Sequence, residues 1–174
     1  MGQGETEKAV KTLQTGLAQV PDSTNLAYQL GELYITQGRF QEAEEIANRI
    51  QTFAPSDDHS QASLHSLIGR IQEAKGMVFE AKNAYQVAAL LAPDVLPYLY
   101  RLGNMEEKLG NWQKALQIYQ ELIDKRYNAE LIKERINVIT KALDIQKDQA
   151  MWKDWVEKKE KTDQEPDEDK AGGP

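Results

Sequence analysis

The sequence of 174 residues contains no cysteine and only two histidines, and both shortages restrict its chemistry. Without cysteine the chain has no disulfide, no thiolate metal site and no cysteine nucleophile. His59 follows Asp57 and Asp58, which gives three candidate metal ligands, but acidic loops far more often only contact water. His65 falls at a core-facing position of a predicted helix, where a packed, neutral imidazole is expected. We therefore predict no metal and no cofactor.

Long apolar runs and an excess of basic residues are also missing. No run approaches the roughly 20 apolar residues of a membrane-spanning helix, so no membrane insertion is expected. The N-terminus, MGQGETEKAV, lacks the basic and apolar segments of a signal peptide. The net charge of −7 argues against nucleic acid, whose binders display a basic face, and against anionic membrane surfaces. The cytoplasm is favoured as the compartment, with the periplasm as the alternative if a leader or an anchor was removed.

Catalytic motifs are absent as well. The sequence has no phosphate-binding glycine loop, no G-x-G-x-x-G, no H-E-x-x-H and no calcium-loop pattern. Carboxylate pairs such as Glu44 and Glu45 are neighbours on a predicted helix and point in different directions, so they are poor acid–base pairs. We predict that the chain is not an enzyme.

What the sequence does contain is internal repetition. Three segments align without gaps: LGELYITQGRFQEAEEIANRIQTFAP, IGRIQEAKGMVFEAKNAYQVAALLAP and LGNMEEKLGNWQKALQIYQELIDKRY. Each has a leading glycine, a second glycine seven residues later and an alanine five residues after that. These positions are Gly31, Gly38 and Ala43, then Gly69, Gly76 and Ala81, then Gly103, Gly110 and Ala115.

Each repeat has the pattern of two helices. Apolar residues at helical spacing surround the leading glycine, which lets a neighbouring helix approach closely. The second glycine ends the first helix, because it can adopt a left-handed conformation without steric penalty. The second helix begins near Phe40, Val78 or Trp112, and proline ends it at Pro55 and Pro93.

These offsets resemble the tetratricopeptide repeat family, whose period is 34 residues and whose signature places L-G, Y, G, A, F/Y, A and P at these positions. Gln72 and Ala47 depart from the usual aromatic residues, as the family tolerates. The resemblance implies an all-α fold, a right-handed α-solenoid of antiparallel helix pairs (a tetratricopeptide-like superhelix) with a C-terminal capping helix.

The implied organisation follows the repeats. Gly4 aligns with an inter-helix glycine, so the chain begins in mid-repeat, either as a lone capping helix or as a piece of a longer protein. An unpaired first helix would leave Val10, Leu13 and Leu17 with one partner fewer. The predicted segments are 1–23, the second helix of an incomplete repeat; 24–61, a repeat with a longer connection or an extra helical turn; 62–95 and 96–129, two repeats; 130–160, a capping helix or helices; and 161–174, a disordered acidic tail.

Two tryptophans lie in the last of these helical segments. Trp152 and Trp155, with Met151 and Val156, cluster on one side of a predicted helix. They either fold back on the capping helix or form an exposed contact for a partner or a second copy of the chain.

The family resemblance places a binding groove along the first helices of the pairs. The groove-facing positions are Asn25, Tyr28, Glu32, Ser66, Arg70, Glu73, Tyr100, Arg101, Asn104 and Lys108. The resemblance therefore implies a non-catalytic interaction module, a scaffold or assembly factor, that binds an extended peptide or a helix of another protein. Tyrosine and arginine are typical of interface hot spots. For each of these residues the alternative interpretation is a solvated helix face.

One class of partner is not expected, and one other hypothesis stays open. Family members that hold the C-terminal tails of heat-shock chaperones use lysines, asparagines and an arginine, and of the corresponding positions (Tyr28, Glu32, Leu67, Pro97 and Arg101) only Arg101 matches. Such tails are therefore not expected as partners. The other hypothesis is a self-associating, homo-oligomeric segment of a larger, membrane-anchored or soluble protein, with contacts through its terminal helices.

Overall fold

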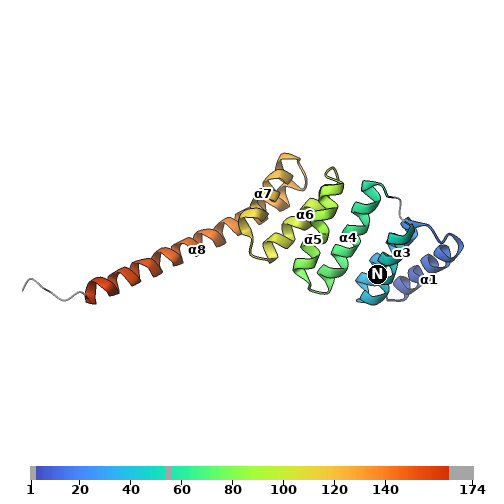
Figure 1. Ribbon diagram of the computed structural model, residues 1–174, viewed down its shortest axis with the longest axis horizontal. Helices are drawn as coiled ribbons and strands as arrows, with labels where there is room; N and C mark the ends of the chain where they lie inside the picture. The colour runs from blue at the N-terminus through green and yellow to red at the C-terminus, as the bar shows by residue number, and fades with distance from the viewer. Residues whose placement is uncertain (1–2, 54–55, 165–174) are drawn as a thin grey trace, which may run out of the picture. The chain divides into compact units, whose positions relative to one another are not determined.

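The computed structural model describes residues 3–53 and 56–164, and all regular structure in these ranges is helical. The chain divides into two units, Met1–Ala129 and Glu130–Pro174, which are described separately (Figure 1). The helices are α1 (Gln3–Gln19), α2 (Thr24–Thr36), α3 (Phe40–Phe53), α4 (Asp58–Ala74), α5 (Val78–Leu91), α6 (Leu96–Lys108), α7 (Trp112–Asp124) and α8 (Ala129–Gln164).

The first unit consists of stacked helix pairs. Helices α2 and α3, α4 and α5, and α6 and α7 pack within pairs, while α1 packs on α2 and each pair contacts the next. Buried apolar residues of α1 to α4 form one continuous cluster, and a smaller cluster joins α5 to α6. The predicted all-α solenoid of helix pairs is confirmed.

The turns within the pairs depend on the second glycine of each repeat. Gly38, Gly76 and Gly110 have φ angles of 70°, 78° and 75°, in the left-handed region that favours glycine. The residue after each glycine then donates its N–H to a carbonyl of the preceding helix, as Arg39 does to Tyr34 O at 2.9 Å. The same bond recurs at 2.9 Å in the other two turns, so the three turns share one geometry.

The leading glycines act through packing instead. A Cβ atom placed on Gly69 would lie 2.7 Å from Cε1 of Tyr85, and one on Gly103 would lie 2.8 Å from Cε1 of Tyr119. Both tyrosine rings are fully buried. The missing side chain therefore leaves room for the aromatic ring of the paired second helix.

The predicted boundary between residues 61 and 62 falls inside α4. The carboxylate of Asp57 accepts a hydrogen bond from Ser60 N at 2.9 Å, which caps the helix and starts it at Asp58. Helix α4 accordingly has 17 residues, whereas α2 and α6 have 13 each. The four extra residues of this repeat include an added helical turn. Pro55 lies outside the described residues.

Helix α1 does not present the apolar face that its sequence suggested. Val10 and Leu17 are buried in the cluster that joins α1 to α4, and Leu13 packs against that cluster. The side chain of Gln14 donates to the hydroxyl of Tyr34 at 2.9 Å. The contacts with α2 are therefore sufficient to cover the apolar side of α1.

The second unit contains one continuous helix, α8, rather than a capping helix followed by another. The prediction that Trp152 and Trp155 fold back on the capping helix is wrong, because both belong to that same helix. Their side chains are 67% and 51% exposed. Helix α8 continues to Gln164, past the predicted start of the tail, and residues 165–174 lie outside the described residues.

Candidate binding groove

The first helices of the three pairs together line a hollow of about 250 Å³. Helix α2 contributes Tyr28 and Glu32, and α6 contributes residues from its first two turns. The full lining is Tyr28, Glu32, Ser63, Ser66, Leu67, Arg70, Pro97, Tyr98 and Arg101. A neighbouring hollow of about 170 Å³ shares Tyr28 and Ser63 and adds Thr24, Asn25, Ile50 and Ser60. We call this lined surface the first-helix groove.

Three hydroxyl groups meet at the wall of the groove. Ser63 Oγ and the Tyr98 hydroxyl are 3.2 Å apart and form a hydrogen bond. The Tyr28 hydroxyl is buried without a partner of good hydrogen-bond geometry. Burial raises the pKa of Tyr28, the adjacent Tyr98 raises it further, and the nearby Ser63 hydroxyl offsets this only in part. Tyr28 therefore faces the groove as a neutral group able to donate or accept one hydrogen bond.

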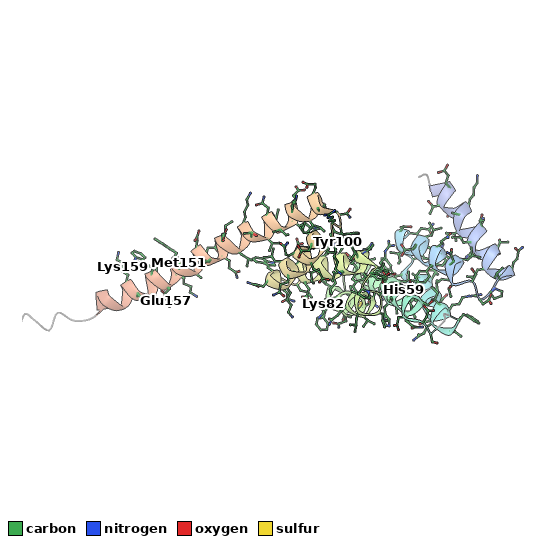
Figure 2. All side chains as sticks on the ribbon, turned by 90° about the horizontal axis from the view of Figure 1, so that it is seen from above. His59, Lys82, Tyr100, Met151, Glu157 and Lys159 are labelled. Carbon is green, nitrogen blue, oxygen red and sulfur yellow. The ribbon has the colours of Figure 1, made fainter. Side chains whose placement is uncertain are left out.

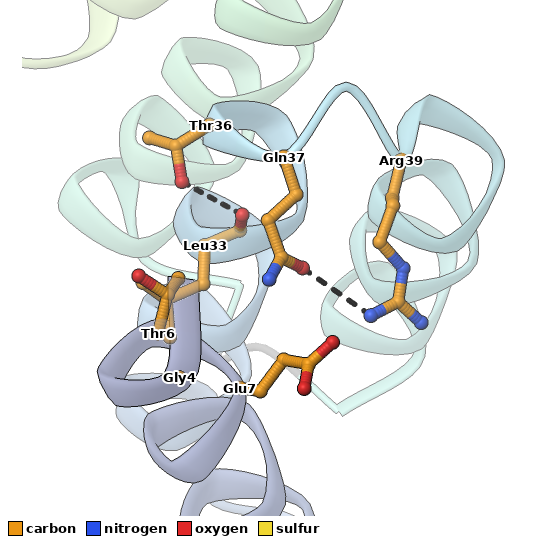
Figure 3. A pocket seen from close by; sticks show the side chains of 7 residues that line it. All are labelled: Gly4, Thr6, Glu7, Leu33, Thr36, Gln37 and Arg39. Carbon is orange, nitrogen blue, oxygen red and sulfur yellow. Dashed lines mark hydrogen bonds between the residues drawn. The ribbon is translucent and has the colours of Figure 1, made fainter. Parts of the chain in front are cut away.

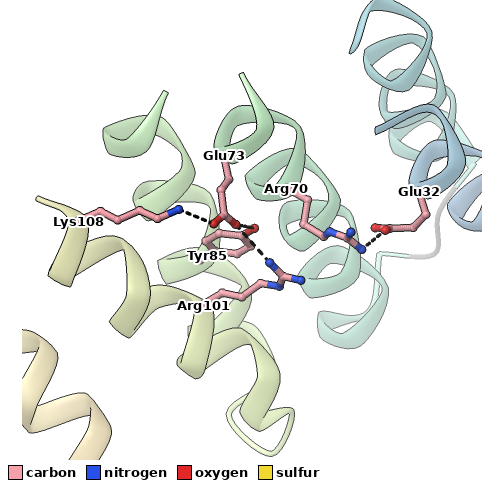
Figure 4. Close-up of polar contacts among 6 residues, drawn as sticks. All are labelled: Glu32, Arg70, Glu73, Tyr85, Arg101 and Lys108. Atoms are coloured by element: carbon pink, nitrogen blue, oxygen red, sulfur yellow. Dashed lines mark hydrogen bonds and ion pairs between the residues drawn. The ribbon is translucent and has the colours of Figure 1, made fainter. Parts of the chain in front are cut away.

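Charged side chains cross the groove between the helix pairs (Figure 4). Arg70 of α4 forms an ion pair with Glu32 of α2. Glu73 of α4 is 3.2 Å from Nη1 of Arg101 and 2.8 Å from Nζ of Lys108, both of α6. Ion pairs therefore connect α2 to α4 and α4 to α6.

Glu73 also accepts a hydrogen bond from the hydroxyl of Tyr85 in α5, at 2.9 Å. Burial alone would raise the pKa of Glu73, but the hydrogen bonds from Lys108 and Tyr85 and the charges of Lys108 and Arg101 outweigh it. The pKa of this carboxyl therefore lies below its usual range. Burial and the charge of Arg101 lower the pKa of Arg70, although an arginine stays protonated at neutral pH.

Aromatic packing marks the end of the groove region on α6. The ring of Tyr100 lies 6.3 Å from that of Tyr119 and 6.0 Å from that of Tyr127, tilted in both pairs. The hydroxyl of Tyr119 donates to Asn104 Oδ1 at 2.7 Å or to Glu107 Oε2 at 2.8 Å. Tyr100 and Asn104 are therefore held by neighbours of their own chain.

The structure thus brings most of the predicted groove residues to one surface. The groove hollow of about 250 Å³ is lined by Tyr28, Glu32, Ser66, Arg70 and Arg101, and the neighbouring hollow of about 170 Å³ is lined by Asn25. Glu73 and Lys108 join through ion pairs, whereas Tyr100 and Asn104 line neither hollow. Trp152 and Trp155 belong to the other unit. The alternative interpretation of a solvated helix face does not describe Tyr28 and Arg70, because Tyr28 is half-buried and Arg70 is paired with Glu32.

Sequence reasoning missed two contributors to the site. Tyr98 occupies the repeat position of the apolar Leu26 and Leu64, and its hydroxyl reaches Ser63. Tyr85 of α5 is outside the predicted groove positions, yet its hydroxyl donates to Glu73. In both cases the available signal was a tyrosine at an apolar position, since a buried tyrosine hydroxyl needs a polar partner.

A hollow of about 830 Å³, larger than either hollow of the first-helix groove, lies outside that groove, between α1, the end of α2 and the following turn (Figure 3). Its lining is Gly4, Thr6, Glu7, Leu33, Thr36, Gln37 and Arg39. Arg39 is engaged locally: it pairs with Glu42 at 2.8 Å and lies over the ring of Tyr34 at 4.4 Å. None of the predicted groove residues reaches this hollow, and its charges do not join several repeats.

Within the described ranges, no group of three or more histidine, aspartate or glutamate side chains is placed to hold a metal ion. His59 lies 3.8 Å from the carboxylate of Asp94, and Asp57 is used in the cap of α4. His65 is half-buried, and burial lowers its pKa. The helices of the described part of the chain include none with the length and apolar character needed to span a membrane.

Comparison with known proteins agrees with this architecture. Two tetratricopeptide repeat family models match, one over residues 1–71 and the other over residues 98–127. No curated protein sequence matches the chain. The chain belongs to the tetratricopeptide repeat family.

Several solved structures share the fold at low sequence identity. A crystal structure of MamA has a TM-score of 0.67 and 20% identity, covering 94% of both chains, and a second has a TM-score of 0.65. BtubC (BKLC) from P. vanneervenii has a TM-score of 0.61 and 16% identity, covering 80% of this chain and 64% of its own. The repeats and this fold support a protein-interaction scaffold, and proteins of this type are typically non-catalytic.

Proposed function

We propose that the protein is a scaffold or assembly factor that binds an extended segment or a helix of another protein in the first-helix groove. The supporting observation is a hollow to which α2, α4 and α6 all contribute side chains. A ligand lying across these helices would contact all three repeats at once. The specificity of binding would then depend on the relative placement of the repeats.

The chemistry of the groove suits a polypeptide ligand. The Tyr28 and Tyr98 hydroxyls can bond to peptide carbonyl or amide groups, and Leu67 and Pro97 supply apolar contact. Arg70 and Arg101 are paired with carboxylates in the free protein, and the remaining N–H groups of each guanidinium can donate to peptide carbonyl oxygens while these ion pairs stay intact.

A groove-filling substitution tests this proposal. Ser66→Trp would fill much of the 250 Å³ hollow without removing any ion pair, whereas Gln86→Trp would place the same side chain at an exposed position of α5. Peptides would first be selected from a displayed random library against the wild-type chain. Their dissociation constants would then be measured by fluorescence anisotropy against all three proteins.

The proposal expects Ser66→Trp to weaken peptide binding at least about tenfold and Gln86→Trp to leave it unchanged. Circular dichroism would verify that both variants retain the wild-type helix content and melting temperature. Equal binding by wild type and a folded Ser66→Trp protein would mean that the groove is not the binding surface.

A further inference from the structure

Helix α8 carries a stripe of exposed apolar side chains at intervals of seven residues. Leu131, Val138, Ile145 and Trp152 are 47%, 59%, 59% and 67% exposed. Seven residues make nearly two helical turns, so these side chains follow one side of the helix and drift by only about 20° per step. The ring of Trp155 stacks on that of Trp152, with centroids 5.1 Å apart, and widens the stripe near its end.

Three charged residues, Glu134, Lys141 and Asp148, accompany this stripe at the same interval, and the last two lie near its centre. Lys141 and Asp148 each lie three residues after a stripe residue, and Asp148 lines a hollow of about 310 Å³ with Met151, Trp152 and Trp155. Among the described residues neither has an ion-pair partner within 4.0 Å. Figure 2 shows Met151 on this part of the helix.

The charges distinguish the ways in which two such helices could pair. In a parallel pair, each Lys141 would face the other Lys141 and each Asp148 the other Asp148, and like charges at this distance repel. In an antiparallel pair with its two-fold axis at Ile145, Lys141 of each helix would lie opposite Gln149 of the other, one residue or about 1.5 Å along the axis from Asp148, which the long lysine side chain can reach. The same register places Val138 of each helix against Trp152 of the other.

We propose that α8 pairs antiparallel with α8 of a second copy of the chain. Ile145 packs on its symmetry mate at the centre, a Val138–Trp152 layer lies on each side, and two Lys141–Asp148 ion pairs flank the apolar stripe. The inference is independent of the first-helix groove, and it gives the hypothesis of self-association a defined surface and register.

Charge balance favours a second copy as the occupant. Residues 141–159 contain five lysines and four acidic residues, a balance of +1, whereas the whole chain has a net charge of −7. Two copies would therefore meet through segments that lack the net negative charge of the chain as a whole. Since a two-fold axis repeats every contact, each favourable pair in this register occurs twice.

Charge reversal tests the register directly. In Lys141→Glu, two carboxylates would meet at each of the two Lys141–Asp148 positions of the interface and repel each other. In Asp148→Lys, two ammonium groups would meet there instead. Sedimentation equilibrium should show a dimer for the wild-type chain, with a dissociation constant raised about tenfold in either single variant. The double variant, Lys141→Glu with Asp148→Lys, should restore the wild-type constant. All of these substitutions are at exposed positions, and circular dichroism would verify the helix content.

A second test addresses the apolar stripe. Trp152→Ala should weaken the dimer about a hundredfold, because the substitution removes two buried layers. Phe79→Ala, at a 57% exposed position of α5, is the matched control and should leave the constant unchanged. A chain that remains monomeric throughout the micromolar range would overturn the proposal. A dimer whose dissociation constant does not change on charge reversal would also overturn the proposal. The same holds for a monomer whose α8 tryptophans bind anionic lipid vesicles instead.

Discussion

Gly69 illustrates, at the scale of single residues, how a missing side chain can determine packing. Its Cα lies so close to Tyr85 that a Cβ atom would approach Cε1 and Cδ1 of the ring to 2.7 and 2.8 Å. Tyr85 is fully buried and its hydroxyl is bonded to Glu73, so the ring has little freedom to move. The repeat pattern predicted this close approach, because a glycine inside a helix otherwise has no benefit.

We expect Gly69→Ala to lower the free energy of unfolding by about 1 kcal/mol. Overpacking by one methyl group costs about 1–3 kcal/mol, and the better helix propensity of alanine returns about 1 kcal/mol. Denaturant titration would measure the change. Gly4→Ala in α1, where no atom lies within 4 Å of the new Cβ, is the control and should be neutral or slightly stabilising. A stabilised Gly69→Ala variant would contradict the packing role.

Glu73 predicts a dependence of stability on pH. Because its pKa is lower in the folded chain than in the unfolded chain, its contribution is present above the ordinary carboxyl pKa and is lost as the pH falls through the folded value. At pH 7, Glu73→Gln should lower the free energy of unfolding by about 1 kcal/mol, a modest effect because solvent screens this partly exposed group. The difference should shrink below about pH 4.

Urea unfolding of both proteins between about pH 3 and 7 measures this effect. Glu121→Gln, which removes only an exposed ion pair between Glu121 of α7 and Lys125 at the end of that helix, is the matched control. A difference between Glu73→Gln and wild type that is constant over this range would show that Glu73 acts through something other than its charge.

The capping of α4 determines, at the scale of elements, where the second repeat begins. Asp57 accepts from Ser60 N at 2.9 Å, while the equivalent contact at α2, between Ser23 and Leu26 N, is longer at 3.4 Å. Asp57→Ala should therefore lower the melting temperature more than Ser23→Ala does. Thermal unfolding followed by circular dichroism would measure both melting temperatures. Equal decreases in the two variants would argue against a stronger cap at Asp57 than at Ser23.

Element boundaries were predictable wherever a glycine or proline imposes them. The turns at Gly38, Gly76 and Gly110 followed from residue type, because few other residues adopt their φ angles. The start of α4 did not, because the repeat alignment left open whether the four extra residues form a longer connection or an extra helical turn. For α8 the signal was present: no glycine or proline occurs between residues 129 and 164, so nothing in that segment ends a helix.

The arrangement of the whole molecule places residues from separate repeats on one surface. The family resemblance could place Tyr28, Arg70 and Arg101 on one face, because equivalent positions of stacked helix pairs align. It could not predict that Arg70 pairs with Glu32, or that Tyr98 joins Ser63, because these contacts depend on side-chain rotamers and on the crossing of neighbouring pairs. The sequence thus predicted which residues lie on the first-helix groove, and it did not predict the ion pairs and hydrogen bonds among them.

The proposed scaffold role depends on the binding of a partner segment in the first-helix groove. The most direct measurement is the change in backbone amide chemical shifts of the ¹⁵N-labelled chain as a library-selected peptide is added. We expect the largest changes to fall on α2, α4 and α6, around Tyr28, Ser66 and Arg101, and to disappear in Ser66→Trp. Changes concentrated on α8, or on the outer side of α3, α5 and α7, would contradict this expectation.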